Sequence, residues 1–227
     1  MSIEIHDQLN QKLFDGEKLK PEIREKILEI VDEFLDNLWV KIEPLDIQLL
    51  GSNASYNYTE FSDLDIHIIT NFEFLDASQE ILNALYNLEK TNFNKNHNIT
   101  IKGIPVELYV EDVDSSAISN GIYSVKDDKW IKFPNKIVDV PQYDLSKQVE
   151  RWKLVIENRL NDENKEELVD LVNRLYMIRK NSIAVDGEYG KGNQLFKEIR
   201  NLGLLDSIKD KIKEITSDEL SLESLYL

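Results

Sequence analysis

Apolar residues recur every three or four positions between residues 21 and 40, a spacing that places them on one face of an α-helix. Acidic residues and lysines fill many of the positions between them, and Pro21 suits a first helical turn. The pattern predicts an amphipathic helix that packs on a sheet. Residues 1–20 show little pattern. The apolar positions of the predicted helix are Ile23, Ile27, Val31, Phe34, Leu35 and Leu38.

Shorter apolar stretches predict strands at residues 45–50 and 64–70. Gly51 and Ser52 interrupt the first stretch, so we expect residues 51–61 to form a turn and a short helix or loop. A second helix is predicted from Asp76 to Phe93. The residues expected on its apolar side are Ile81, Leu82, Leu85 and Leu88.

Two hairpins are predicted after this helix. Residues 98–102 and 104–110 flank Gly103, which suits a tight turn, and residues 121–133 are expected to turn on Asp127 and Asp128. Beyond Pro141 the spacing becomes helical almost throughout, with a break near Gly203. We therefore expect an α+β protein, in which a core domain of residues 1–141 has a small mixed sheet flanked by helices and residues 142–227 form an all-α domain.

The composition narrows the classes of function. Asp and Glu number 43 against 27 Lys and Arg, giving a formal charge of −16, which disfavours nonspecific binding to nucleic acid. Cysteine is absent, and the three histidines are scattered, so no zinc cluster is indicated. The polar N-terminus and the lack of a long apolar run predict a cytoplasmic protein without a membrane segment.

Two carboxylates in a strand that otherwise reads as buried are the main chemical signal. Alternation along the strand places Asp65 and His67 on the face opposite Leu64 and Ile66, with Asp63 beside them. Like charges at that spacing repel unless a cation holds them. If residues 104–110 form the neighbouring strand, Glu107 is the third acid of a cluster. Three such acids suit Mg²⁺, which prefers oxygen ligands.

The turn at Gly51 and Ser52 supplies a second signal. A glycine that leaves a strand lets the backbone approach a phosphate closely, and a hydroxyl or a free N–H group donates to the phosphate oxygens. Ser52, Asn53 and the nearby amides are candidates for this role. The connection of twelve residues allows the turn and the aspartates to meet at one triphosphate.

This arrangement resembles the DNA polymerase β-like nucleotidyltransferase superfamily. The residues that carry the resemblance are Gly51-Ser52, then Asp63-Leu64-Asp65, then Glu107 in a later strand. The pattern of the superfamily is a Gly-Ser turn, an Asp-x-Asp/Glu strand and a distant third acid. The resemblance covers roughly residues 22–112, and stand-alone minimal nucleotidyltransferases of bacteria and their phages look most similar. The all-α second half is similar to the helical domain that often follows this core.

The resemblance implies a reaction and a set of roles. Asp63 and Asp65 would bridge two Mg²⁺ ions, with Mn²⁺ as a substitute, and Glu107 would bind the ion that activates the acceptor hydroxyl. Ser52 would hold the β- and γ-phosphates of an NTP such as ATP. The implied reaction is attack on the α-phosphorus with release of pyrophosphate. The resemblance leaves three kinds of acceptor open, namely a small molecule, a protein hydroxyl or an RNA 3′ end.

Further cations are expected to contact the triphosphate or the acceptor. Arg179, Lys180 and Lys191 concentrate positive charge in the helical half, although ordinary surface charge is the alternative for each. The helical domain is expected to form the other wall of the cleft. His67 is expected to be a hydrogen-bonded, partly buried histidine rather than a substrate ligand.

Three alternatives remain open at this stage. The fold could serve a nucleotide-binding or antitoxin-like interaction module without turnover. A synthase that cyclises oligonucleotides is less favoured, because such enzymes are usually longer. In the third alternative Asp63 only caps a turn, and Glu107 is an edge charge that discourages aggregation.

Overall fold

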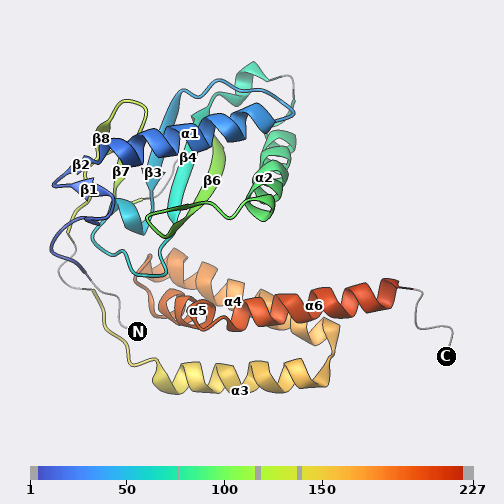
Figure 1. The fold of residues 1–227 in the computed structure, drawn as a ribbon. Helices are drawn as coiled ribbons and strands as arrows, with labels where there is room; N and C mark the ends of the chain where they lie inside the picture. Colours follow the sequence, from blue (N-terminus) through green and yellow to red (C-terminus); the bar gives the residue numbers. More distant parts are fainter. Residues whose placement is uncertain (1–4, 76, 116–118, 137–139, 222–227) are drawn as a thin grey trace. The chain divides into compact units, whose positions relative to one another are not determined.

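The computed structural model describes residues 5–75, 77–115, 119–136 and 140–221. The chain divides into two compact units, and the division falls between residues 138 and 139, close to the expected boundary. The first unit combines helices and a mixed sheet, and the second is helical (Figure 1). The predicted α+β class with C-terminal helices is confirmed.

A six-stranded sheet with the order β5-β6-β4-β3-β7-β8 organises the first unit. Strands β4 and β6 are parallel, and the other neighbouring pairs are antiparallel. The chain between β4 and β6 therefore includes a crossover, which helix α2 provides. The strands are β3 (Asp46–Leu50), β4 (Leu64–Thr70), β5 (Thr100–Ile101), β6 (Ile104–Asp112), β7 (Ile122–Ser124) and β8 (Lys129–Lys132).

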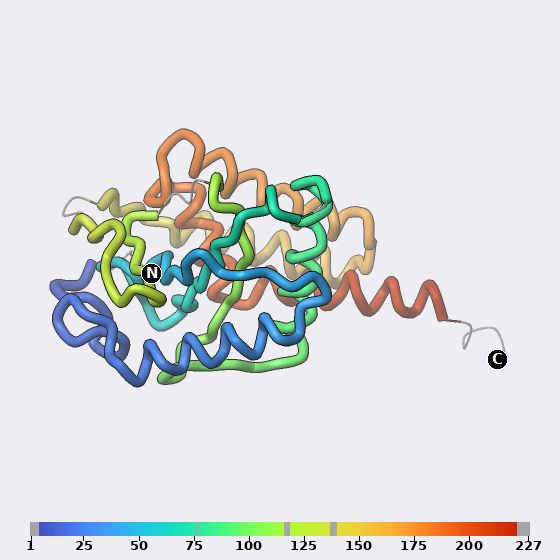
Figure 2. Tube along the Cα trace, turned by 90° about the horizontal axis from the view of Figure 1, so that it is seen from above, coloured from blue at the N-terminus to red at the C-terminus, as the bar shows by residue number. Residues whose placement is uncertain are grey.

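Helix α1 (Pro21–Asn37) packs its apolar face into the core of this unit. It crosses the strands in Figure 1 and lies along one side of them in Figure 2. Its predicted apolar face is buried, with Ile27 and Phe34 each 1% exposed. Leu64, Ile66 and Ile68 of β4 belong to the same apolar cluster. The opposite face of the sheet is left for the alternate, mostly polar side chains.

Helix α2 (Gln79–Asn96) differs from the prediction in its start and in its buried face. It begins after Ser78, whose hydroxyl accepts a hydrogen bond from the N–H of Ile81, whereas Asp76 lies outside the described residues. The predicted apolar side was right for Leu82, which is buried, but wrong for Ile81 and Leu88, which are 62% and 58% exposed. The buried side of α2 consists of Leu82, Tyr86 and Phe93, because the ring of Tyr86 packs on Phe72 and the ring of Phe93 packs on Phe34.

The N-terminal segment is more ordered than its sequence pattern suggests. Strands β1 (Phe14–Asp15) and β2 (Lys18–Leu19) form a small antiparallel hairpin, and Phe14 stacks on Trp130 of β8. Its apolar residues are too few to show a period. They are nevertheless buried in the main cluster, so a weak sequence pattern does not mean that the segment lies outside the core.

Both predicted hairpins are confirmed. Lys102 and Gly103 form a two-residue turn between β5 and β6, and both have positive φ, as a tight hairpin turn requires. Asp128 also has positive φ in the turn between β7 and β8. Tyr123 and Trp130 pair across those strands in an edge-to-face contact.

The second unit contains four helices among residues 140–221. Helix α5 packs on α4, and Gly203 adopts the left-handed conformation that separates α5 from α6. Leu168, Leu171 and Leu175 supply the buried side of α4, as their spacing predicts. No described helix has both the length and the apolar character that a bilayer crossing requires. The helices are α3 (Ser146–Asp162), α4 (Lys165–Asp186), α5 (Lys191–Asn201) and α6 (Leu204–Leu220).

Truncating Phe34 tests the packing of α1 on α2. Phe34 is buried and meets Phe93 edge to face, with 5.1 Å between ring centroids. We expect Phe34→Ala to lower the free energy of unfolding by about 3–5 kcal/mol, because it leaves a cavity in the core. Chemical denaturation would measure this loss. Phe74→Ala is the control, since Phe74 is 83% exposed and its loss should change stability little.

Candidate functional site

The parallel pairing of β4 with β6 brings two of the predicted acids together. Asp65 is the register partner of Glu107, so their side chains leave adjacent strands on the same face of the sheet. Both side chains are half-buried. The expectation that the strand of Glu107 neighbours the strand of Asp65 is confirmed.

The charges of the three acids interact. The pKa of Asp65 is raised to about 6, chiefly by burial and also by the nearby carboxylates of Asp63 and Glu107, while His67 and Lys90 oppose the shift. Asp63 lies immediately before β4 and is also half-buried. The acids are thus close enough to affect one another, and the buried charge of Asp65 is under-compensated without an added cation.

Gly51 lies directly against the carboxylate of Asp65. It follows β3 with φ 74° and ψ −161°, a conformation that favours glycine. A Cβ atom at this position would lie 1.9 Å from Oδ2 of Asp65. The glycine of the Gly-Ser turn is therefore needed both for its backbone conformation and for the space that Asp65 occupies.

Ser52 and Asn53 begin the short helix η1 (Ser52–Ala54) after that glycine. The Ser52 hydroxyl is half-buried and donates to Oγ of Ser62 at 2.7 Å, which links the turn to the segment just before Asp63. Asn53 is fully buried, and its amide donates to the main-chain oxygen of Asp63 at 2.8 Å. The Asn53 side chain thus holds the aspartate loop in place from inside the protein.

The donor set suits a hard divalent cation, because it consists of carboxylates. Within the described residues, however, no group of three or more acidic or histidine side chains converges closely enough to hold an ion. Mg²⁺ is commonly held by one or two carboxylates, with waters and substrate phosphates as its other ligands. Asp63, Asp65 and Glu107 are the residues that would hold it.

Sequence reasoning missed Tyr109 and Lys90 as parts of this cluster. The Tyr109 hydroxyl donates to Oε2 of Glu107 at 2.5 Å, and Nζ of Lys90 lies 3.5 Å from the centre of the Tyr109 ring. Burial lowers the pKa of Lys90. A signal for Lys90 was available, because it lies on the same helical face as Tyr86 and Phe93, where a lysine is unusual.

His67 and Glu111 extend the polar face away from the aspartates. His67 stacks on Tyr109 with 4.6 Å between ring centroids, and its Nδ1 lies 3.1 Å from Oε1 of Glu111 without good hydrogen-bond alignment. Contact with His67 lowers the pKa of Glu111. His67 is partly buried, as expected, but among the described residues its Nδ1 lacks the expected hydrogen bond and has only the contact with Glu111.

The predicted cations of the helical half lie on α4 and α5. The guanidinium of Arg179 is 5.1 Å from the Phe196 ring, and Nζ of Lys191 is 5.9 Å from the Tyr143 ring. Lys180 and Lys191 are exposed. Lys191 is also the first residue of α5, where the two glycines around it form a close helix connection. Their contact with a triphosphate stays a prediction.

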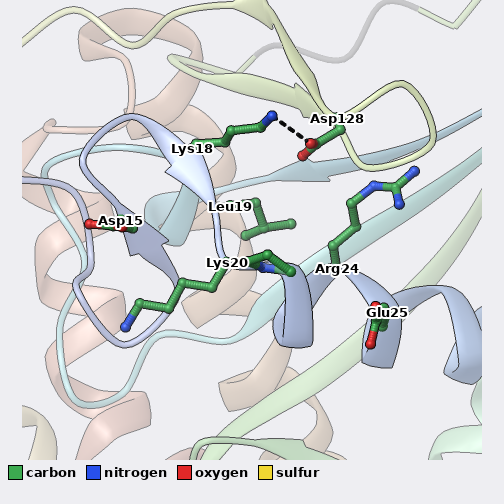
Figure 3. A pocket seen from close by; sticks show the side chains of 8 residues that line it. Asp15, Lys18, Leu19, Lys20, Arg24, Glu25 and Asp128 are labelled. Atoms are coloured by element: carbon green, nitrogen blue, oxygen red, sulfur yellow. Dashed lines mark ion pairs between the residues drawn. The ribbon is translucent and has the colours of Figure 1, made fainter.

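A pocket of about 350 Å³ at the start of α1 contains none of the predicted site residues (Figure 3). Its cations are engaged within the protein: Lys18 pairs with Asp128 at 3.0 Å, and Arg24 donates to the main-chain oxygens of Val125 and Lys126. We interpret this pocket as a hollow between the N-terminal hairpin and the β7–β8 turn, and we place the candidate site at Asp65 instead.

Comparisons of the chain with models of protein families, with curated proteins and with solved structures found no match. The superfamily resemblance therefore rests on the motif residues of the sequence and stays a prediction.

Replacing Gly51 tests the contact between the turn and Asp65. Gly51→Ala should lower stability more than Gly16→Ala, because Gly16 also has positive φ but has no neighbouring atom within 4 Å of an added Cβ. The Gly16 variant should lose about 1–2 kcal/mol from backbone strain alone. Denaturant unfolding of both variants would give the comparison.

A double-mutant cycle isolates the clash from the strain. In an Asp65→Ala background, Gly51→Ala should cost less than in the wild type, and the cost that remains should reflect the strained backbone at φ 74° and ψ −161°. An undiminished cost in that background would show that the Asp65 carboxylate is not what the added methyl group meets.

The raised pKa of Asp65 predicts a pH dependence of stability in the absence of divalent ions. Its pKa is about 6 in the folded protein and about 3.9 in an unfolded chain, so the folded state binds more protons between these values. The free energy of unfolding should therefore fall as the pH rises from about 4 to about 6, and stay lower above that.

Asp65→Asn should remove this part of the pH dependence. At pH 7.5 we expect the variant to be more stable than the wild type by on the order of 1–2 kcal/mol, with the difference vanishing near pH 4. Denaturant unfolding in EDTA across this range would measure it. Asp32→Asn on the exposed side of α1 is the control. A variant less stable than the wild type at pH 7.5 would contradict the prediction.

Proposed function

We propose that the protein is a Mg²⁺-dependent nucleotidyltransferase, which transfers a nucleoside monophosphate from an NTP to an acceptor hydroxyl and releases pyrophosphate. The observation that carries the proposal is the register pairing of Asp65 with Glu107, together with Gly51 packed against the Asp65 carboxylate. Two motifs that are distant in the sequence are thus brought to one edge of the polar face, as the superfamily resemblance requires.

Each residue has a role that its position suits. Asp63 and Asp65 would hold the divalent ions, and Glu107 would complete the set at the side of the acceptor. Ser52 has a half-buried hydroxyl that now donates to Ser62, and it could donate to a phosphate oxygen instead. The bound ions would stabilise the charge of the attacking and leaving oxygens.

For Asn53 the buried side chain supports a positioning role in place of the predicted contact with phosphate. Its side-chain amide is buried and bonded to Asn10 and to the main chain at Asp63, so it would act by fixing the loop that carries Asp63. A direct contact between this side chain and the triphosphate would require the loop to open.

A nucleotide-binding or antitoxin-like module on the same fold is the second candidate. The observation that favours it is the hydroxyl of Tyr109 on Glu107, together with acids that do not converge within the described part of the chain. Such a protein would bind a nucleotide and release no pyrophosphate.

Thermal denaturation with Mg²⁺-ATP or Mg²⁺-GTP tests the site. Saturating nucleotide should raise the melting temperature of the wild type by several degrees, because binding at about one hundred times Kd adds about 2.7 kcal/mol of stability. The double variant Asp63→Asn/Asp65→Asn should show no such rise over its own baseline, since it has lost the ligands of the ion.

Asp32→Asn/Asp36→Asn on α1 removes the same charge at exposed positions and should respond like the wild type. An equal response of the Asp63/Asp65 variant would count against the site. Pyrophosphate release with a cell extract as the source of acceptor separates turnover from binding alone, and its absence despite a nucleotide response would favour the second candidate.

A further inference from the structure

Glu107 is restrained through one of its two carboxylate oxygens. The Tyr109 hydroxyl donates to Oε2 at 2.5 Å, a short distance that is typical of a hydrogen bond to a charged acceptor. Both residues lie on the same face of β6, two positions apart. Within the part of the chain that the structure describes, no hydrogen bond engages Oε1 of Glu107, so that oxygen is the one left for a cation.

Tyr109 is itself held by groups from two other elements. Nζ of Lys90 on α2 lies 3.5 Å from the centre of its ring, which is within the range of a cation–π interaction. The ring of His67 on β4 stacks on it at 4.6 Å. With its ring fixed by the helix and the neighbouring strand, the hydroxyl has little freedom to leave Glu107.

Lys90 brings a positive charge close to the acids without a direct ion pair in the described residues. Its charge interacts with Glu107, Asp65 and Glu111. A resident cation in this position lowers the repulsion between the acids when no divalent ion is bound. The same charge opposes the arrival of a divalent ion at those acids.

We propose that Tyr109 is a positioning residue that orients Glu107 for a divalent cation, and that Lys90 fixes Tyr109 and acts as a built-in counter-charge with which that cation competes. This inference rests on the proposed function, because it assigns roles toward the ion of that site. It predicts that removing the hydroxyl and removing the ammonium group change ion affinity in opposite directions.

Mn²⁺ binding to the full-length protein tests the proposal, measured by the loss of the free-ion signal in electron paramagnetic resonance. Tyr109→Phe should weaken Mn²⁺ binding by about tenfold, since removing a partner of a metal ligand typically has an effect of that size. Lys90→Met keeps the apolar stem and should tighten binding by roughly two- to tenfold, because it removes an opposing charge. Lys90→Gln provides a second version of the same test.

Matched controls separate these effects from general damage to the fold. Tyr86→Phe removes another buried hydroxyl from the first unit, and Lys95→Met removes an exposed charge from α2; neither should change Mn²⁺ affinity. At saturating Mn²⁺, the thermal response of Tyr109→Phe to ATP should match that of the wild type, because the defect lies in ion affinity.

The outcomes distinguish this inference from the proposed function. If the wild type binds Mn²⁺ and Tyr109→Phe binds it with the same affinity, the role assigned to Tyr109 is overturned. If Lys90→Met binds Mn²⁺ more weakly than the wild type or equally well, the role assigned to Lys90 is overturned. Either result would leave the proposed function standing. A wild type that binds no Mn²⁺ with or without nucleotide would overturn both.

Discussion

The parallel pairing of β4 with β6 is the constraint on which the candidate site depends. It places Asp65 and Glu107 at the same level of two adjacent strands, although 42 positions separate them in the sequence. A slip of one residue would send Glu107 to the apolar face, where α1 packs. The buried residues Leu64, Ile66 and Leu108 on the opposite face disfavour such a slip, because it would expose them. The core therefore determines the geometry of the acids.

The cost of gathering acids on a partly buried face explains the groups around them. Burial and the acidic neighbours of Asp65 raise the pKa of its carboxyl group, and Lys90 and His67 provide the opposing charge. Tyr109 adds a hydrogen bond to Glu107. A protein that only needed a stable sheet would be more stable with neutral residues here. An under-compensated carboxylate at this position is what the proposed cation site would require.

The Gly-Ser turn is coupled to the acids by close contact and by hydrogen bonds within the first unit. Gly51 leaves room for the Asp65 carboxylate, Ser52 bonds to Ser62, and Asn53 bonds to the main chain at Asp63. The loop between β3 and β4 is thus fixed at both ends. A substrate that engaged Ser52 would exchange one of these bonds for a phosphate contact, which gives the loop a direct means of responding to a nucleotide.

The sequence by itself determined the acids of the candidate site and most of the helices and strands, because the spacing of apolar residues encodes which side of most elements is buried. It also gave the alternation that separates Asp65 from Ile66. The β1–β2 hairpin lay outside its reach, since the apolar residues of that segment are too few to show a period. Only the tertiary structure decided that β6 lies beside β4, that Lys90 reaches Tyr109, and that α2 buries Tyr86 and Phe93 instead of Ile81 and Leu88. The physical reason is that these contacts join segments far apart in the chain, and the periodicity of one segment does not specify the partner against which its face will pack.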